Sequence, residues 1–396
     1  SEDIRVLSEK LRSQENGEPV NIEDLASLQD NLADIDAALF YPLILDDRIE
    51  LVITTANAPP LRRTVEGVDR VKLNRAITEF RQALQDPTSN AIAPAQQLYQ
   101  WIVKPIEADL AAAGVKTIVY SADGALRYIP LAALHDGEQW LAASFRINNI
   151  TARSLTNLNT IPQKEPKVLA GAFADKDITY PIQGTSYRGL PFAGQEVEFL
   201  DKTLPIITSL FDSGFTLKAV ENEIDRVNIL HFATHAAFVP GDPKKSFILF
   251  GDGGTQDLDD ILTWQLSNID LVVLSACETG LGQFDNEAGQ ILGLGHRFQQ
   301  KGARAVVASL WQVNDGSTQL LMNDFYNSLG EEMHKNEAVQ KAQLAMINSE
   351  LTVVEAMSRS GLEALSTETG EPVARIAGKI NHPHYWAPFI LIGNGL

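Results

Sequence analysis

The stretch Leu271-Val-Val-Leu-Ser-Ala-Cys277-Glu-Thr-Gly280 decides the fold of this chain. Four apolar residues, then a cysteine and a Glu-Thr-Gly turn, predict a buried strand that ends on a reactive side chain. A second stretch, Asn228-Ile-Leu-His-Phe-Ala-Thr-His235, has the same form and ends on a histidine. If both are parallel strands of one sheet, His235 and Cys277 lie at its carboxyl edge, where open α/β sheets bind ligands.

Length and composition limit the classes of protein to which this chain can belong. Its 396 residues are 44% apolar, which is enough for one large core or two ordinary ones. The formal net charge of −19 argues against a nucleic-acid partner, because phosphates are bound by Lys and Arg, and is compatible with basic peptides. A single cysteine excludes an internal disulfide and fits a cytoplasmic, reducing compartment. Neither a transmembrane run nor a signal peptide is present, so no membrane partner is expected.

Changes in composition predict three parts. Residues 1–35 are polar and acidic with helical spacing, which favours a helical lead-in or the tail of a missing upstream repeat domain. Since Ser1 is not a natural start, we expect a fragment or a processed form. Residues 36–165 open with a strand–turn–strand hairpin around Asp46-Asp47. A polar run with two prolines at 160–166 predicts the boundary to the second half, residues 166–396.

Short apolar runs alternate with helically periodic segments through most of the chain. Strands are predicted at 116–120, 147–151, 168–173, near 206, at the two stretches quoted above, at 305–311 and at 387–393, with a hairpin at 248–252. Helices are predicted at 73–84, 93–113 with a break at Pro105, 193–200, 257–265, 288–300, 317–329 and 336–349. Residues 179–192 are expected to form a loop, and residues 350–380 an irregular insertion. This alternation predicts an α/β fold with a largely parallel sheet between helices.

Two readings are open for each of the reactive side chains. A cysteine after an apolar strand is often a small buried hydrophobe, and a histidine at a strand end is often structural. The alternative is a thiol nucleophile with an imidazole base. His235, at the tip of its strand, is a better base than His231 inside it, because a base must reach both thiol and substrate. Cys277 follows His235 by 42 positions (277 minus 235), and the chain between them holds a hairpin and a short helix, a sensible crossover.

Other kinds of active site find no support in the sequence. No Gly-x-Ser-x-Gly elbow and no Walker-type phosphate loop are present. His and Cys do not cluster with zinc spacing, so neither a metal nor a cofactor is predicted. Paired carboxylates such as Asp259-Asp260 are expected on a solvated helix face.

Beyond these two stretches, further motifs follow in a fixed order along the chain. They are Asp123-Gly-Ala-Leu126-Arg-Tyr-Ile-Pro130, Leu190-Pro191 with Glu196, Gly293-Leu294, Gly302-Ala303, Ala308-Ser-Leu-Trp311, Phe325-Tyr326 and His382-Pro-His-Tyr-Trp386-Ala-Pro-Phe. Together with the His235 and Cys277 stretches, this series resembles the CHAT family, caspase-like cysteine peptidases commonly found beside tetratricopeptide repeats.

The resemblance implies a caspase-like, mostly parallel sheet flanked by helices, whose N-terminal half is a degenerate, inactive copy. It implies that His235 is the base and Cys277 the nucleophile of a cysteine endopeptidase. The backbone N–H groups of Ala236 and Cys277 would bind the oxyanion; Ala236 stands where the family usually has glycine. It also implies a protein or peptide substrate, and a regulatory protein partner bound through missing upstream repeats.

Substrate binding is expected after the strand at 305–311. A peptide would add a strand beside Ser309-Leu310-Trp311. Asp315 follows this run, and Asp285 and Glu287 are rival acids, so a preference for Arg or Lys before the cut is predicted; solvated loop carboxylates are the alternative. For the whole chain, the competing class is a catalytically silent, caspase-like scaffold. A thiol acyltransferase is a weaker alternative, since no carrier site is evident.

Overall fold

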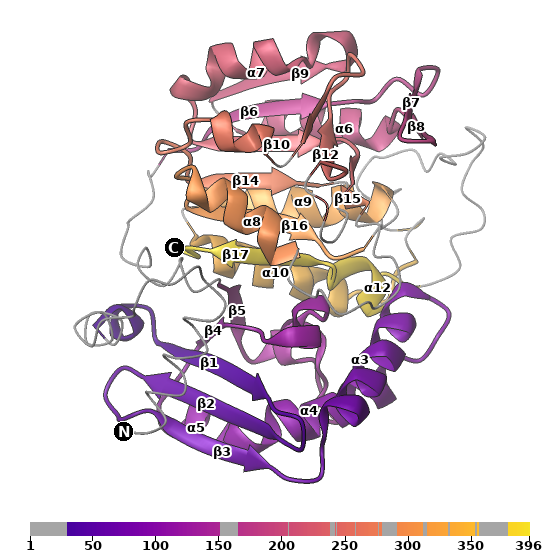
Figure 1. Cartoon of the computed structure of the whole chain (residues 1–396). Helices are drawn as coiled ribbons and strands as arrows, with labels where there is room; N and C mark the ends of the chain where they lie inside the picture. The colour runs from indigo at the N-terminus through magenta and orange to yellow at the C-terminus, as the bar shows by residue number, and fades with distance from the viewer. Residues whose placement is uncertain are drawn as a thin grey trace. The chain divides into compact units, whose positions relative to one another are not determined.

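The computed structural model of the chain (Figure 1) describes residues 30–150, 165–204, 206–237, 242, 244–257, 259–275, 277–278, 291–311, 315–331, 333–352, 355 and 379–396. The chain divides into two compact units. The first unit comprises Ser1–Ala83, Asn90–Thr160 and Ile392–Gly395, and the second comprises Leu84–Ser89, Ile161–Leu391 and Leu396. The boundaries at 35 and 165 stay predictions, because residues 1–29 and 151–164 lie outside the described part.

Five strands of the first unit are ordered β3-β2-β1-β4-β5. They are β1 (Ala37–Ile44), β2 (Ile49–Thr55), β3 (Leu61–Val65), β4 (Thr117–Tyr120) and β5 (Arg146–Asn149). β1 and β2 are antiparallel around the turn at Asp46-Asp47, which confirms the predicted hairpin, whereas β4 and β5 join in parallel. The edge strand β3 was not predicted, because its sequence Leu-Arg-Arg-Thr-Val carries charge where apolar residues would signal a strand.

Helices of the first unit follow the predicted periodicity. They are α3 (Arg70–Gln85), α4 (Ile92–Ile102) and α5 (Glu107–Ala112), with a 3-10 turn, η1 (Lys104–Ile106), between the last two. In α3, the apolar residues Leu73, Ile77, Phe80 and Leu84 are fully buried and recur on one helix face. The turn at Pro105 confirms the predicted break, since proline cannot donate the backbone hydrogen bond that an uninterrupted helix needs.

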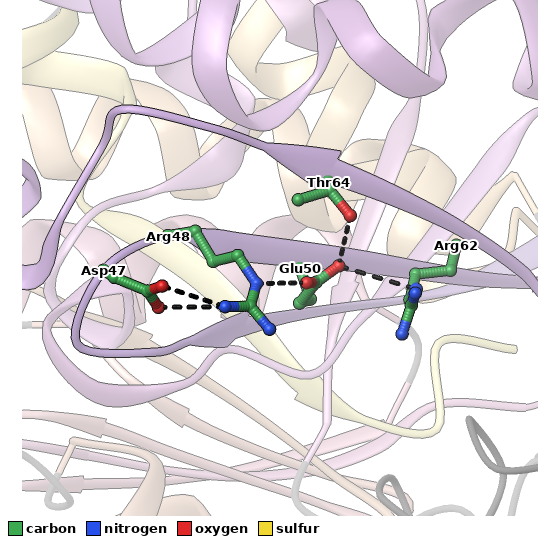
Figure 2. A network of polar contacts seen from close by, with 5 residues as sticks. All are labelled: Asp47, Arg48, Glu50, Arg62 and Thr64. Atoms are coloured by element: carbon green, nitrogen blue, oxygen red, sulfur yellow. Dashed lines mark hydrogen bonds and ion pairs between the residues drawn. The ribbon is translucent and has the colours of Figure 1, made fainter.

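A buried carboxylate joins β2 to the charged edge strand β3 (Figure 2). Glu50 is only 6% exposed and accepts hydrogen bonds from Arg48 Nε at 2.7 Å and Thr64 Oγ1 at 2.8 Å. Arg62 Nε lies 3.6 Å from the same carboxylate, and Arg48 also pairs with the exposed Asp47. A buried charge is unfavourable without partners, so this network holds β3 in its register.

The sheet of the second unit is parallel at each strand pair for which the register is given, with strand order β17-β16-β14-β10-β6-β9. Its strands are β6 (Lys167–Ala172), β9 (Ile206–Phe211), β10 (Ile229–Ala233), β14 (Leu271–Leu274), β16 (Ala305–Ser309) and β17 (Phe389–Gly393). Its helices are α6 (Pro191–Thr203), α7 (Leu217–Glu223), α8 (Ile291–Gln300), α9 (Asp315–Gly330), α10 (Lys335–Ile347) and α12 (Pro383–Trp386). This arrangement confirms the predicted fold class, although α7 and α12 were not predicted.

Both faces of β10 are covered by buried side chains. On one face, His231 lies 3.1 Å from Glu196 of α6 through Nε2 and 2.9 Å from the Tyr326 hydroxyl of α9 through Nδ1. On the other face, the Phe232 ring packs 6.3 Å from Trp264, whose ring lies 6.3 Å from Phe298 of α8. His231 is therefore an interior residue of the strand that ties two helices to the sheet.

Two histidines fix the short helix α12. Nδ1 of His382 accepts the His384 backbone N–H at 3.1 Å, and its Nε2 lies 2.9 Å from the Ser89 carbonyl. Nδ1 of His384 lies 3.1 Å from the Leu84 carbonyl. A carbonyl only accepts, so Nε2 of His382 carries the hydrogen while Nδ1 keeps its lone pair, and the ring is neutral. Burial lowers the pKa of both histidines, and the nearby carboxylate of Asp86 partly opposes this shift.

The network around Glu50 predicts unequal effects of two surface substitutions. Arg48→Met removes the charged hydrogen bond to the buried Glu50 carboxylate, leaves it only the longer charged contact with Arg62, and should lower the free energy of unfolding by roughly 1–3 kcal/mol. Asp47→Asn is the matched control: it removes only an exposed ion pair and should cost under about 1 kcal/mol. Urea denaturation of both variants measures the difference. Equal losses would show that Glu50 does not depend on Arg48.

The histidines of α12 predict a stability that falls in acid. Their pKa values in the folded chain lie below the ordinary 6.5, so the unfolded chain takes up protons first as pH falls below about 6.5. The free energy of unfolding should therefore decrease between pH 7.5 and pH 5.5. The double variant His382→Asn, His384→Asn should lose less stability over this interval in urea denaturation. An identical loss in both proteins would contradict the assignment.

Candidate active site

At its carboxyl end, the chain of β10 leaves the large sheet and enters a small one with strand order β13-β12-β11-β15. The strands are β11 (Ala236–Ala237), β12 (Phe247–Leu249), β13 (Thr255–Asp257) and β15 (Cys277–Glu278). Ala236 is the parallel partner of Cys277. Neighbouring strands lie about 4.8 Å apart. The backbone of Ala236, next to the predicted base, is therefore adjacent to the backbone of Cys277, the predicted nucleophile. The description of β15 is limited to its backbone.

The register between these two chain segments changes by one residue on the way to the site. In the large sheet Ile229 pairs with Leu271, an offset of 42 (271 minus 229). In the small sheet Ala236 pairs with Cys277, an offset of 41 (277 minus 236). The histidine segment thus contains one extra residue, in the manner of a β-bulge. Bulges re-aim a side chain, and this one falls between Phe232 and Ala236, the stretch that contains His235.

His235 is 6% exposed and is held from two sides. Its ring packs edge-on against Tyr187, with centroids 5.2 Å apart, and against Phe173 at 6.3 Å. Its Nε2 lies 2.6 Å from the backbone carbonyl of Arg188. Since that oxygen can only accept, Nε2 carries the hydrogen, and the lone pair of the neutral ring lies on Nδ1. The basic atom of His235 is therefore Nδ1.

A hairpin that the sequence did not reveal supplies this carbonyl. It consists of β7 (Thr179–Ile182) and β8 (Thr185–Arg188), within the segment predicted to be a loop. Tyr187 joins a buried apolar cluster with Phe173, Phe247 and Leu249, against which Tyr180 also packs. The sequence of the hairpin is mostly polar and exposed, so it does not predict strands. The Gln183-Gly184 turn, with φ of 50° and 85°, is nevertheless of the kind that closes tight hairpins.

The backbone N–H of Ala236 points toward β15. Leu249 N–H donates to the His235 carbonyl at 2.9 Å, which makes Ala236 and Ile248 a pair that is not hydrogen-bonded directly. The amide of Ala236 must then face the opposite side of β11, where Cys277 lies. This is the direction that the predicted oxyanion donor requires.

The predicted substrate-binding run extends from the end of β16, in the strand next to β14. Leu310 N–H donates to the Pro388 carbonyl at 2.9 Å, and the Ser309 hydroxyl donates to the Trp311 carbonyl. The Trp311 side chain is 3% exposed, and its indole N–H donates to the His384 carbonyl at 3.1 Å. Of this run, the backbone of Ser309 and Trp311 is thus better placed than the indole to meet a substrate.

The predicted pocket acids are placed only in part. Asp315 is the first residue of α9, directly after the run, and only its backbone is described. Asp285 and Glu287 lie outside the described residues. Within the described part, no three His, Cys, Asp or Glu side chains are grouped so that they could hold a metal ion. Of the helices described, none has the length and apolarity needed to cross a membrane.

Two solved structures of low sequence identity share this fold. Two structures of the separase–securin complex from Saccharomyces cerevisiae match with TM-scores of 0.50 and 0.51 at 8% identity. Each match covers 94% of this chain but only 31% of the separase-complex chain. The Arg-specific cysteine proteinase gingipain R matches with a TM-score of 0.45 at 11% identity, over 82% of this chain and 74% of that one.

Sequence comparisons give the family. No curated protein sequence matches the chain. The family model of the CHAT domain matches residues 93–394, which is well over half of the chain and includes every predicted site residue. This confirms the resemblance drawn from the ordered motifs. The chain therefore belongs to the CHAT domain family and carries a caspase-like, cysteine peptidase-like fold.

Proposed function

We propose that this chain is a cysteine endopeptidase with Cys277 as nucleophile and His235 as base. The observation that carries the proposal is the parallel pairing of Ala236 with Cys277, which brings the two segments together at one sheet edge. Ligands of parallel α/β sheets bind at this edge. A buried histidine whose Nε2 hydrogen is bound by the Arg188 carbonyl keeps its lone pair on Nδ1, the atom suited to deprotonate a neighbouring thiol.

The proposed reaction is hydrolysis of a peptide bond in two steps. Nδ1 of His235 takes the thiol proton of Cys277, and the sulfur attacks the carbonyl carbon. The C–N bond then breaks, the leaving amine receives that proton from His235, and a thioester remains. In the second step, His235 deprotonates a water molecule that attacks the thioester. The carboxylic acid leaves, and the proton returns to the thiol.

The Arg188 carbonyl takes the part that a carboxylate plays in other triads. It accepts the Nε2 hydrogen, so it fixes the tautomer and the ring orientation of His235. When the ring becomes an imidazolium, this hydrogen bond becomes charge-assisted and stronger. The hairpin that carries Arg188 is consequently a part of the proposed catalytic machinery.

The amides of Ala236 and Cys277 are the proposed oxyanion donors, each worth roughly 3 kcal/mol to the transition state. One observation favours the alternative of a silent scaffold. The Ala236 N–H faces β15, so the pairing between β11 and β15 competes with an oxyanion for this hydrogen-bond donor. The proposal therefore includes a departure of β15 from this ladder when a substrate binds, which frees the donor.

Specificity and partners belong to the same proposal. We propose a preference for Arg or Lys before the cut, with Asp315, Asp285 or Glu287 as the acidic partner. An Asp at the first position of α9 also has a purely structural explanation, because it stabilises the helix N-terminus. The charge of −19 favours basic peptides, and a regulatory protein partner is proposed to act through upstream repeats.

A protection experiment with a peptide library tests the dyad directly. Iodoacetamide should alkylate Cys277 in the wild type, and library peptides with Arg or Lys before the cut should slow the reaction. His235→Ala should lower the alkylation rate, since the thiolate loses its base. Cys277→Ala and His235→Ala should each reduce peptide cleavage by at least about 10³-fold. Mass spectrometry measures both alkylation and cleavage.

Two outcomes would decide against parts of the proposal. Alkylation that is indifferent both to peptides and to His235→Ala would leave the scaffold as the better function. Cleavage after Leu or Asp in the library would remove the basic pocket while keeping the peptidase.

The hairpin carbonyl can be moved by a single methyl group. A Cβ at Gly189 would lie 2.2 Å from the Asp175 backbone oxygen, so Gly189→Ala must shift the chain next to Arg188. A displacement of about 1 Å at a catalytic group can cost roughly 10²-fold in rate, and we expect a kcat loss of this order. Gly214→Ala is the control, because its Cβ meets nothing within 4 Å. Equal kcat values for both variants would remove Arg188 from the machinery.

A further inference from the structure

The run Ser309–Trp311 is bound by a C-terminal segment, residues 381–388, which we term the brace. Its Pro388 carbonyl accepts the Leu310 N–H at 2.9 Å, and its His384 carbonyl accepts the Trp311 indole N–H at 3.1 Å. Because Trp311 is almost fully buried, its N–H finds no water in place of His384. The brace therefore helps to fix the backbone of Leu310 and the indole of Trp311.

The brace is internally rigid. Tyr385 N–H donates to the His382 carbonyl at 3.1 Å, and the Trp386 indole donates to the Asn381 carbonyl at 3.0 Å. The buried amide of Gln343, on α10, donates to the carbonyls of Trp386 at 3.3 Å and Phe389 at 3.2 Å. These hydrogen bonds tie the residues of the brace to one another and to α10.

On its other side, the brace is bound to the connection between α3 and α4. The rings of His382 and His384 reach the carbonyls of Ser89 and Leu84, the two ends of the segment Leu84–Ser89. Among the described residues before 161, this segment alone is grouped with the second unit. His384 thus binds the α3–α4 connection through its ring, and it binds the Trp311 indole through its backbone carbonyl.

We propose that His382 and His384 are positioning residues for substrate binding, through which the segment Leu84–Ser89 sets the place of the run Ser309–Trp311. The part that concerns substrate rests on the proposed peptidase function. The part that concerns coupling rests on the contacts alone. A partner that moves the α3–α4 connection would in this way tighten or loosen substrate binding without touching the site.

Two substitutions at one position separate the two roles of His382. Asn at 382 can accept the His384 N–H, as helix-capping asparagines do, but it is too short to donate to Ser89. Gln at 382 can donate from Nε2 to the Ser89 carbonyl, but it does not reproduce the Nδ1 acceptor. The variants His382→Asn and His382→Gln therefore remove the outer contact and the cap, respectively. Each serves as the control for the other.

The expected result is a change in KM and not in kcat. His382→Asn should raise KM for a cleaved peptide by roughly fivefold or more, a common size for coupled sites, with kcat nearly unchanged. His382→Gln should stay closer to the wild type in KM. Amide exchange should become faster at residues 84–89 and, in step with it, at 305–311 in His382→Asn. Equal thermal midpoints of the two variants would exclude a general loss of stability.

The exchange measurement does not depend on peptidase activity, so the two proposals fail separately. Faster exchange at 84–89 with unchanged exchange at 305–311 would overturn the coupling, whatever the enzyme does. A drop in kcat at constant KM would overturn the positioning role in substrate binding. Coupled exchange in a chain that cleaves no peptide would support the coupling and sink the peptidase.

Discussion

The structure depends on how two parallel strands, β10 and β14, leave their common sheet. Inside the sheet the register between them is constant. At the edge it slips by one residue, and both chains re-pair in a second, smaller sheet. The slip sets His235 against the hairpin and sets Ala236 beside Cys277. Without the slip, His235 itself would be paired with Cys277 on the adjacent strand. The Ala236 amide would then not be the one that faces Cys277.

Main-chain groups make several of the contacts that orient side chains around this edge. The Arg188 carbonyl orients the imidazole, the Ala236 amide faces the cysteine strand, and the His384 carbonyl holds the Trp311 ring. Buried side chains such as Glu196 and Tyr326 act one layer below, where they tie α6 and α9 to β10 through His231. Backbone groups at the edge are thus supported by buried polar contacts in the layer below.

Much of the fold was readable from the sequence, because the strands of a parallel sheet are continuous apolar runs and the helices between them are periodic. The candidates His235 and Cys277 followed from their place at the ends of two such runs. The hairpin at 179–188 and the edge strand β3 were missed, since their outward residues are polar and only tertiary packing makes them strands. The one-residue slip was also beyond prediction: it is a property of pairing between distant segments and has no local signature. Asp285 and Glu287 lie outside the described residues, so the acidic pocket stays a prediction.

The hairpin contact has a consequence for how this protein can diverge. Every amino acid offers the same carbonyl, so the contact with the imidazole does not depend on the side chain at 188, which donates instead to the Lys176 carbonyl, whereas the neighbouring glycine is constrained by the backbone of Asp175. In an alignment of relatives, position 188, whose carbonyl contacts the imidazole, should therefore vary. Position 189, which does not contact the imidazole, should be constant. An evolutionary search for functional residues would pass over Arg188 and stop at Gly189.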